Sequence, residues 1–529
     1  MLDIVSVIGG FGIYHTIVIA LAVTRAFPTA WTNMLTPLIA PDVDHWCARP
    51  AGFLNLSVEQ WKEMAIPKLQ GDSYAKCDMF SVSFVNDSWV VDKNVTVPCG
   101  RWEYNTSTHK NTIVEQWDLV CKNDWHRSAM QSIVMAGSLV GGLLFGDLSD
   151  RFGRRRVFFT CATIVFVFGS LAAFSPGIGW FNAARFFLST GIAGCQATAV
   201  SLLMEIMPPE FRMMMNVGFG IGYTIPLLIL PVLAYTLDSW NYLQLGAGLF
   251  ALLLLPYWFI IQESPRWLMT KSRLDEAERA LVRILRINRK PVPAMEQIMT
   301  ELVLHSTSKP RESAFRFLDF FSTPRLRRNT LVLFSLWTLG ALVYYHLVLT
   351  STAVPGNPYI NYALSAFAEI PAGLVGLYIA RRWSRRKSQC TALILAGLAA
   401  IPAPFLPRGS PIWLNIFSHM LIRFFILSAG FIKWIMVLEV FPTTARSFGF
   451  ACCLTCSRFG GMVAPFLKDL GDVTQYWVPH MFVAACCFFM AGTTLLLPET
   501  LNKPLPDTFY EADKMDRKKA PKPAKNMPV

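Results

Sequence analysis

Twelve apolar segments, each long enough to cross a lipid bilayer as a helix, restrict this chain of 529 residues more than any other feature. A bilayer core of about 30 Å requires roughly 20 apolar residues in helical conformation. The first six segments lie near residues 11–31, 129–147, 157–176, 179–206, 213–236 and 242–261. The second six lie near residues 329–351, 359–380, 389–407, 411–437, 447–467 and 478–497. We therefore expect an all-α membrane protein with twelve spans in two groups of six.

The distribution of charge supports this interpretation and indicates an orientation. Only 16% of the residues are charged, whereas a soluble domain carries about 25%. The formal net charge of +13 does not indicate nucleic-acid binding, because the Lys and Arg residues gather at the ends of apolar segments rather than on one soluble face. Basic residues in the short loops 151–156 and 381–387 are typical of the cytoplasmic side of a membrane. This pattern predicts that both termini are cytoplasmic.

A polar insert, residues 41–127, separates the first two segments. An even number of cysteines together with several glycosylation sequons predicts an oxidising, glycosylating compartment, so we expect this insert outside the cell. The sequence leaves the three possible disulfide pairings open. The disulfide candidates are Cys47, Cys77, Cys99 and Cys121, and the sequons lie at Asn55, Asn86, Asn94 and Asn105.

The rest of the chain divides into four expected regions. A first half of six spans covers residues 1–262, and a second half covers residues 329–500. Between them, residues 263–328 form a basic linker with an amphipathic helix near Leu274–Ile287, and the Lys- and Pro-rich tail, residues 501–529, is expected to be disordered. No nucleotide loop, metal-ligand cluster or nucleophile motif occurs, so we expect neither an enzyme nor a cofactor or metal site.

A weak duplication relates the two halves. In each half a pair of arginines is followed by a glutamate, by an arginine seven residues later, and by a second glutamate. The first half has Arg154, Arg155, Glu205, Arg212 and Glu263, and the second has Arg385, Arg386, Glu439, Arg446 and Glu499. Subtracting the numbers of matched residues gives offsets of 231, 234, 234 and 236 residues. Parallel repeats of six spans are the arrangement of major facilitator transporters.

These charges lie at predicted cytoplasmic helix ends, which suggests a gating network. Acidic and basic groups there would pair across the cytoplasmic face when the halves close and separate when they open; simple anchoring at the interface is the alternative. Such pairs are individually weak when solvated, so a network of them would stabilise the closed state without preventing it from opening. The expected members are Asp150, Arg154, Arg155, Glu205, Arg212, Glu263, Arg266, Arg385, Glu439, Arg446 and Glu499.

Four short motifs resemble a known family. The run Gly-Asp-Leu-Ser-Asp-Arg-Phe-Gly-Arg-Arg at 146–155 is similar to the signature loop of major facilitator proteins. The runs Glu-Ser-Pro-Arg-Trp-Leu at 263–268, Glu-Val-Phe-Pro-Thr at 439–443 and Leu-Pro-Glu-Thr at 497–500 resemble the organic-ion transporters of that superfamily, solute carrier family 22. The loop at 381–386 departs from the pattern, because many members have an Asp and a Gly there.

The resemblance implies a major facilitator fold with a large extracellular loop between helices 1 and 2, located in the plasma membrane. It implies alternating-access transport of organic cations, organic anions or carnitine-like zwitterions. The expected partners are a small organic ion and the lipid bilayer, with sodium or proton coupling as possibilities, and no nucleic acid.

Charged residues inside the spans bear on the charge of the substrate, because an ionisable group in a membrane is a functional candidate by default. Arg458 matches a position where cation transporters of the family tend to have Asp, and where anion and carnitine transporters have Arg. A guanidinium there would hold a carboxylate through two parallel hydrogen bonds. Glu369 would balance Arg458 or face a quaternary ammonium, which keeps zwitterions in consideration.

Aromatic and polar residues complete the expected substrate site. Tyr344 and Tyr345 match aromatic positions of the family's binding site, and Tyr223 and Asn33 are further candidates. We expect Arg423 near the outer mouth, whereas Lys433 extends to the cytoplasmic interface as a snorkelling residue.

Together these features predict a transporter that favours organic anions or carnitine-like zwitterions. An organic cation transporter is the alternative, and a transport-dead sensor or scaffold is a further one.

Overall fold

The structure is a computed structural model that describes residues 4–69, 74–85, 88–107, 110–208, 212–308, 317–407, 410–443, 445–501, 503 and 506–514. Ten of the described helices are long and apolar enough to cross a membrane. Two shorter apolar helices, residues 222–236 and Val478–Thr494, occupy the fifth and twelfth expected positions. The expected helical fold with segments at all twelve positions is therefore confirmed.

The first half is a bundle that begins near the N-terminus. It contains α2 (Ile13–Met34), α3 (Thr36–Ile39), α6 (Trp125–Phe152), α7 (Arg154–Ala173), α8 (Ile178–Ile206), α9 (Arg212–Thr236) and α10 (Trp240–Leu249). The last of these continues as a 3-10 segment, Phe250–Phe259. Pro28 lies inside α2, and Pro226 and Pro231 lie inside α9, as is tolerated where neighbouring helices satisfy the freed backbone groups.

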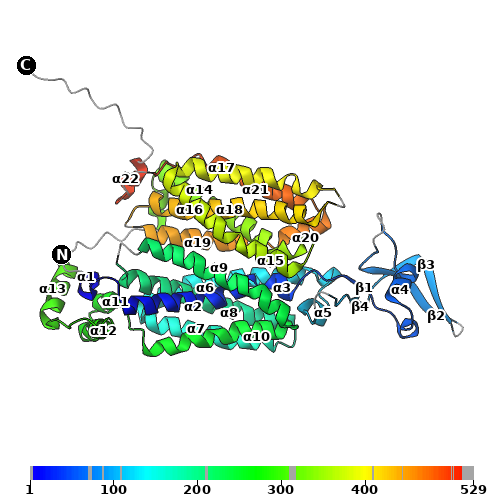
Figure 1. The fold of residues 1–529 in the computed structure, drawn as a ribbon, viewed down its shortest axis with the longest axis horizontal. Coiled ribbons are helices and arrows are strands. Elements are labelled where there is room, and N and C mark those ends of the chain that lie inside the picture. Colours follow the sequence, from blue (N-terminus) through cyan, green and yellow to red (C-terminus); the bar gives the residue numbers. More distant parts are fainter. Residues whose placement is uncertain are drawn as a thin grey trace, which may run out of the picture.

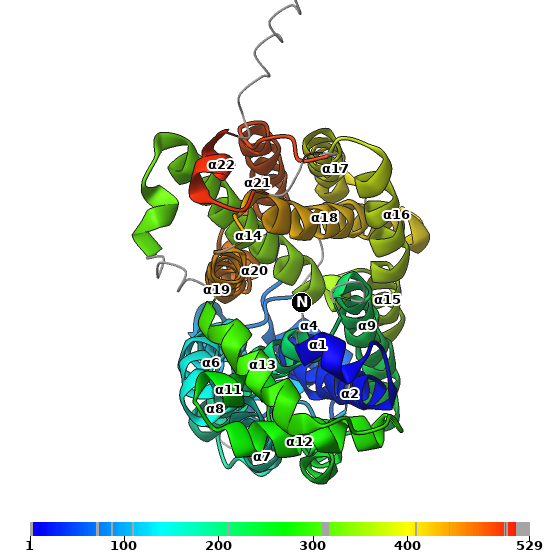
Figure 2. The ribbon, with the colours of Figure 1, turned by 90° about the vertical axis from the view of Figure 1, so that its left-hand side faces the viewer.

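The second half repeats this arrangement. It contains α14 (Pro324–Leu349), α15 (Pro358–Phe367), α16 (Glu369–Arg382), α17 (Arg385–Ala400), α18 (Ile412–Val440), α19 (Arg446–Val463), α20 (Phe466–Val473) and α21 (Val478–Thr494). Viewed along the helices, the two halves lie side by side as separate bundles (Figure 2).

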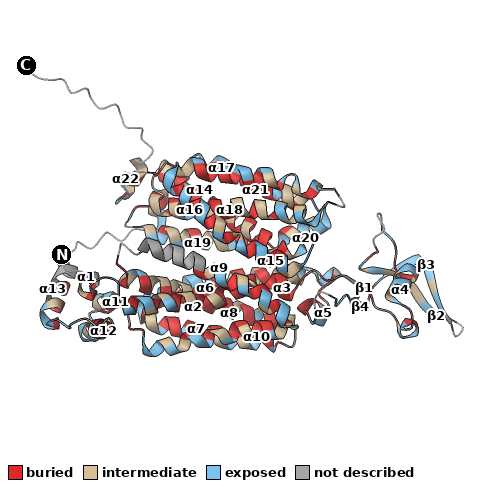
Figure 3. Cartoon of the chain, in the orientation of Figure 1, coloured by how far each residue is buried: buried red, intermediate tan, exposed pale blue. Residues whose placement is uncertain are grey.

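Many large apolar side chains remain exposed on the bundle, among them Leu143, Phe174, Trp180, Phe259 and Leu374, which are 61% to 73% exposed. An apolar surface of this extent is stable only against another apolar phase. Figure 3 shows exposed residues along the helices of both halves, with buried residues between them. This is the pattern expected for helices whose outer faces contact lipid.

The two ends of the bundle differ in what they carry (Figure 1). At one end, which we call the insert end, lie the strands and helices of residues 41–127. At the other, the linker end, lie α1 (Ile4–Ile8), α11 (Pro265–Thr270), α12 (Leu274–Ile287), α13 (Met295–Ser308) and α22 (Phe509–Lys514). Both described ends of the chain therefore lie at the end opposite the insert.

The insert is a small domain of short elements. These are β1 (His45–Cys47), α4 (Val58–Ala65), β2 (Asp78–Val85), β3 (Ser88–Pro98), β4 (Trp102–Tyr104) and α5 (Ile113–Gln116). β1 pairs with β4 and β2 with β3, both antiparallel.

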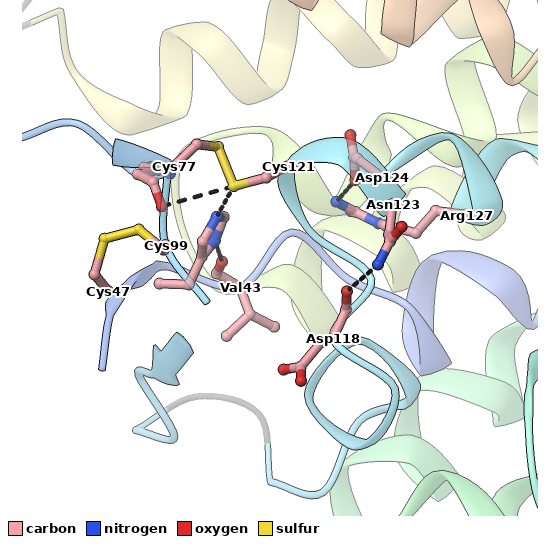
Figure 4. The surroundings of a disulfide bond; sticks show 11 residues. Val43, Cys47, Cys77, Cys99, Asp118, Cys121, Asn123, Asp124 and Arg127 are labelled. Atoms are coloured by element: carbon pink, nitrogen blue, oxygen red, sulfur yellow. Dashed lines mark hydrogen bonds and ion pairs between the residues drawn. A yellow bond between two sulfur atoms is a disulfide. The ribbon is translucent and has the colours of Figure 1, made fainter. Parts of the chain in front are cut away.

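Two disulfides close the insert, and they resolve the pairing that the sequence left open. Cys47 is joined to Cys99 and Cys77 to Cys121 (Figure 4). The bridged residues are 52 and 44 positions apart. Loops of that length correspond to a stabilisation on the order of 4 kcal/mol per bridge in the chain-entropy account.

The linker helix α12 has the predicted bounds, Leu274–Ile287. Its buried face contains Ala277, Leu281 and Ile284, which belong to the same apolar core as Ile4 and Ile8 of α1. The tail departs from the expectation of disorder in one segment, because residues 509–514 form α22. Phe509 packs against the larger apolar core, which includes residues of both halves, and Thr323 donates a 2.6 Å hydrogen bond to Asp513.

Glycosidase treatment of the protein from a eukaryotic host is expected to sharpen its gel band and shift it to lower mass. Asn55, Asn94 and Asn105 are exposed on the insert, where an oligosaccharyltransferase can reach them, and Asn86 lies outside the described residues. A variant with Gln at all four positions is the control and should show no shift. An unshifted band for the unmodified chain would contradict the placement of the insert outside the cell.

Candidate substrate site

Six candidate residues from five helices lie together in the middle of the bundle, where the two halves meet. Tyr223 lies within electrostatic reach of Tyr345, Glu369 and Asn33, and Tyr345 within reach of Arg458 and Glu369. The first half contributes Asn33 from α2 and Tyr223 from α9, and the second contributes Tyr344, Tyr345, Glu369 and Arg458. We call these six residues, together with Arg423, the central cluster.

Glu369 is buried, with 8% of its surface exposed, and its carboxylate accepts three hydrogen bonds. The Tyr344 hydroxyl donates to Oε1 at 2.8 Å, and Thr224 of the first half donates to Oε2 at 3.1 Å. Arg423 donates to Oε1 from Nη2 at 3.1 Å and forms an ion pair. The carboxylate is therefore neutralised within the protein and also connects the two halves.

Arg423 corrects one expectation. It lies in the middle of α18 rather than near an outer mouth, and it is 2% exposed. Its guanidinium carbon lies 5.4 Å from the centre of the Tyr344 ring. Two opposite charges in different spans of one half were the available signal for this pair, but the sequence does not show which spans are neighbours.

Arg458 has a different environment. It is partly exposed in α19 and interacts electrostatically with the Tyr345 hydroxyl. Among the described residues, no carboxylate lies within ion-pair distance of Arg458. Glu369, the structural partner considered for Arg458, is paired with Arg423 instead. Two residues further along, α19 packs closely on α14 at Gly460, where a Cβ would overlap the carbonyl oxygen of Thr338.

Lys433 corrects a second expectation. Its side chain turns inward and does not extend to the membrane interface. Nζ lies 3.5 Å from the carbonyl oxygen of Leu336 and 4.5 Å from the centre of the Trp337 ring, both in α14.

The first-half charge motif forms a compact network at the linker end. Arg154 pairs with Asp150 at 2.8 Å and with Glu205 at 2.9 Å. Glu263 accepts hydrogen bonds from the backbone amides of Arg154 and Arg155, the first residues of α7, at 2.9 and 3.1 Å. A carboxylate at a helix N-terminus accepts hydrogen bonds from the free backbone amides and interacts favourably with the helix dipole.

The second half repeats these contacts. Arg385 pairs with Glu439 at 3.3 Å, and Glu499 accepts from the backbone amides of Arg385 and Arg386 at 3.0 and 3.3 Å. Burial alone would raise the pKa of Glu499. Hydrogen bonds from the Ser384 hydroxyl and from backbone amides outweigh this effect and hold that pKa below its usual range. The carboxylate therefore stays ionised at neutral pH.

The remaining expected members of the network are less engaged. Arg446 is within electrostatic reach of Glu439 and Asp507, and Arg266 is exposed on α11. The side chain of Arg212 lies outside the described residues. In the described part of the chain, the ion pairs at the linker end all join residues of the same half.

Contacts between the halves occur at the insert end instead. Ser132 of α6 donates to the carbonyl oxygen of Met462 at 2.6 Å, and Ser128 donates to Asp469 at 2.8 Å. Tyr362 of α15 donates to the carbonyl oxygen of Met34 at 3.0 Å. The structure is therefore closed at the insert end, and the predicted cross-half pairing at the linker end stays a prediction.

Replacing Glu439 with Gln is expected to lower the maximal transport rate, normalised to surface protein, by about fivefold to tenfold with little change in KM. Arg385 has no counterpart of Asp150 in its loop, so Glu439→Gln leaves its guanidinium without a carboxylate partner. Loss of such a partly buried partner costs about 1–3 kcal/mol. Glu205→Gln should have a smaller effect, because Arg154 retains Asp150. Concentration-dependent uptake measures both. Equal, unaffected rates would contradict a gating role, and Lys271→Met, an exposed linker change, is the control.

Comparison with known proteins places these features in a family. Residues 91–510 match the family described as sugar (and other) transporter. The chain is 32% identical to human organic anion transporter 3, over 99% of this chain and 95% of the relative. It is 30% identical to an organic cation transporter protein of Drosophila melanogaster, over 98% of this chain and 95% of the relative. Solute carrier family 22 member 3 of Rattus norvegicus is 33% identical, over 79% of this chain and 75% of the relative.

Solved structures agree on the fold. The inward-open conformation of the xylose transporter XylE from E. coli superposes with a TM-score of 0.61 at 14% identity, covering 93% of this chain and 98% of that one. A partially occluded inward-open conformation of the same transporter gives a TM-score of 0.60.

Proposed function

The chain belongs to the sugar (and other) transporter family of major facilitator proteins and, within it, to the solute carrier family 22 organic-ion transporters, and from this premise we propose that its substrates are organic anions or carnitine-like zwitterions. Membership makes the chain a multi-pass membrane transporter of organic ions rather than an enzyme. Its relatives include both cation and anion transporters, so the proposal concerns the sign of the charge on the substrate.

The observation that carries the proposal is the pairing of Glu369 with Arg423, which leaves Arg458 as the uncompensated charge of the central cluster. A guanidinium that no carboxylate of the protein neutralises attracts the carboxylate of a substrate and repels a simple cation. The geometry of two parallel hydrogen bonds fits a carboxylate or sulfonate head group.

The wider charge balance supports the same sign. The Arg, Lys, Asp and Glu side chains that are buried among the described residues are three arginines and one glutamate, namely Arg25, Arg185, Arg423 and Glu369. An interior with more positive than negative charge raises the local concentration of anions.

A zwitterion remains within the proposal for a specific reason. Both oxygens of Glu369 already accept hydrogen bonds, but carboxylate oxygens have further lone pairs, and the tyrosine rings nearby offer π faces to a quaternary ammonium. The carboxylate of such a substrate would still lie at Arg458.

The contacts between the halves support alternating access with the insert outside. A transporter closed at the insert end and similar to inward-open XylE faces the cytoplasm with its linker end. On this assignment both termini are cytoplasmic, the protein lies in the plasma membrane, and closure at the linker end would rearrange the charge networks of Arg154 and Arg385.

Uptake into cells that express the chain tests the proposal. Labelled carnitine, an aromatic organic anion and tetraethylammonium are compared over a range of concentrations, with and without sodium and at two external pH values. Saturable uptake of the anion or of carnitine supports the proposal, and dependence on sodium or pH identifies a coupling ion. Preference for tetraethylammonium would assign selection to Glu369 and the aromatic residues. Absence of uptake for all three would favour a sensor or scaffold.

A further inference from the structure

Lys433 is an internal cation that the central cluster does not use. Ionisable groups within a span are costly, and lysine is retained there chiefly when it has a partner or a role. The Lys433 ammonium has three donors, and the structure gives it one acceptor, the carbonyl oxygen of Leu336. Among the described residues, no carboxylate lies within ion-pair distance of its Nζ.

An aromatic wall holds the ammonium in place without neutralising it. Nζ lies over the Trp337 ring, and that ring packs against Trp434 and Phe450 with centroid distances of 5.3 and 5.6 Å. A cation–π contact of this kind contributes about 0.5–2 kcal/mol, but it leaves the net charge intact.

Few atoms of the protein surround the backbone opposite Lys433. A Cβ added to Gly340 would lie 2.9 Å from Nζ and would meet no other heavy atom within 4 Å. Gly340 and Lys433 are both partly exposed. Space beside the ammonium is therefore available to a small group that is not part of the protein.

Contacts on α14 and on α19 both show that Lys433 lies nearer the linker end than Arg458, and by the same number of helical residues. On α14, Lys433 lies beside Gly340, whereas Arg458 faces Tyr345, five residues nearer the insert end. On α19, Lys433 lies within electrostatic reach of Cys453, again five residues before Arg458. Five residues of helix correspond to about 7.5 Å along the axis.

We propose that Lys433 is a second anion-binding position, which takes an acid group or small anion about one and a half helical turns from Arg458 toward the linker end. The inference rests on the proposed function, because Arg458 must hold the first negative group. The ligand at Lys433 is either the second acid group of a dianion or a separate inorganic anion such as chloride.

A length series separates these two sources. Linear dicarboxylates from three to eight carbons and the matched monocarboxylates are compared as inhibitors of labelled aromatic-anion uptake, in chloride and in gluconate medium. If a dianion bridges the two cations, dicarboxylates of intermediate length should inhibit at about tenfold lower concentration than monocarboxylates, without a requirement for chloride. If chloride occupies Lys433, monoanion uptake should fall several-fold in gluconate, and chain length should matter little.

Lys433→Met removes the charge at similar size and should abolish whichever preference the unchanged chain shows, while Lys433→Arg should retain it. The dicarboxylate-to-monocarboxylate and chloride-to-gluconate readouts are ratios within one variant, so a smaller amount of protein at the cell surface does not affect them. Lys271→Met controls for the loss of a positive charge elsewhere at the linker end. Anion uptake with an unchanged ratio in Lys433→Met would overturn the assignment and leave the proposed function standing. Absence of anion uptake in the unchanged chain would overturn both.

Discussion

Replacing Arg458 with Ala is expected to raise the concentration of organic anion needed for half-maximal uptake by about 10- to 100-fold. Hydrogen bonds to charged groups contribute about 1.5–3 kcal/mol, and each 1.4 kcal/mol corresponds to a factor of ten in affinity. No described carboxylate neutralises Arg458, and within the protein its interaction is with the neutral Tyr345 hydroxyl, so the lost ionic interaction is with the substrate. Uptake measured over a range of anion concentrations gives the value.

Two further substitutions at this position sharpen the result. Arg458→Lys keeps the charge but loses the planar pair of donors, so its affinity should lie between those of the unchanged chain and the Ala variant. Arg458→Asp reverses the charge and should weaken anion uptake further while admitting simple cations. Unaltered selectivity in the Asp variant would remove Arg458 from the site, and Lys271→Met provides a matched change of charge at an exposed position.

Replacing Arg423 with Ala is expected to lower the free energy of unfolding by about 3–5 kcal/mol, because it leaves Glu369 as an unpaired buried carboxylate. The two side chains are only 2% and 8% exposed, and their charged atoms lie 3.1 Å apart. Thermal unfolding of the purified protein in detergent measures the loss.

The double variant Arg423→Gln with Glu369→Gln tests the cause. It replaces the buried charges by neutral hydrogen-bonding groups and should recover more than half of the stability lost in Arg423→Ala. The exposed pair of Arg151 and Asp147 offers a control: its residues are 69% and 59% exposed, so Arg151→Ala should cost less than about 1 kcal/mol. A double variant no more stable than Arg423→Ala would mean that the ion pair is not what stabilises this region.

The bilayer explains why so much of the fold could be predicted. It requires a nearly uniform length of apolar helix, so segments such as 412–440 stand out without any knowledge of their neighbours. The duplicated charges marked the ends of matching helices, because charged groups are costly within the bilayer and gather where helices leave it. Glu263 and Glu499 accordingly cap the N-termini of α7 and α17 in the same manner.

Contacts between helices explain what could not be predicted. Resemblance to the organic-ion transporters predicted Arg458 and Tyr344 as members of the substrate site, and this stays a prediction. The partner of Glu369 depends on how α16 lies against α18, which no local pattern records. The direction of Lys433 depends on the space left by Gly340, three spans earlier in the sequence. Pairing of the four cysteines likewise depends on the paths of β2 and β3.

One measurement tests the charge preference most directly. Purified protein in liposomes is presented with labelled phenylacetate and labelled phenethylammonium, which share a ring and differ in the sign of their charge, with phenylacetamide as a neutral competitor. Our account predicts saturable uptake of phenylacetate that is lost in Arg458→Asp, with little uptake of phenethylammonium and weak competition by the amide. Saturable uptake of phenethylammonium in preference to phenylacetate would contradict the assignment of Arg458 as the residue that selects the charge of the substrate.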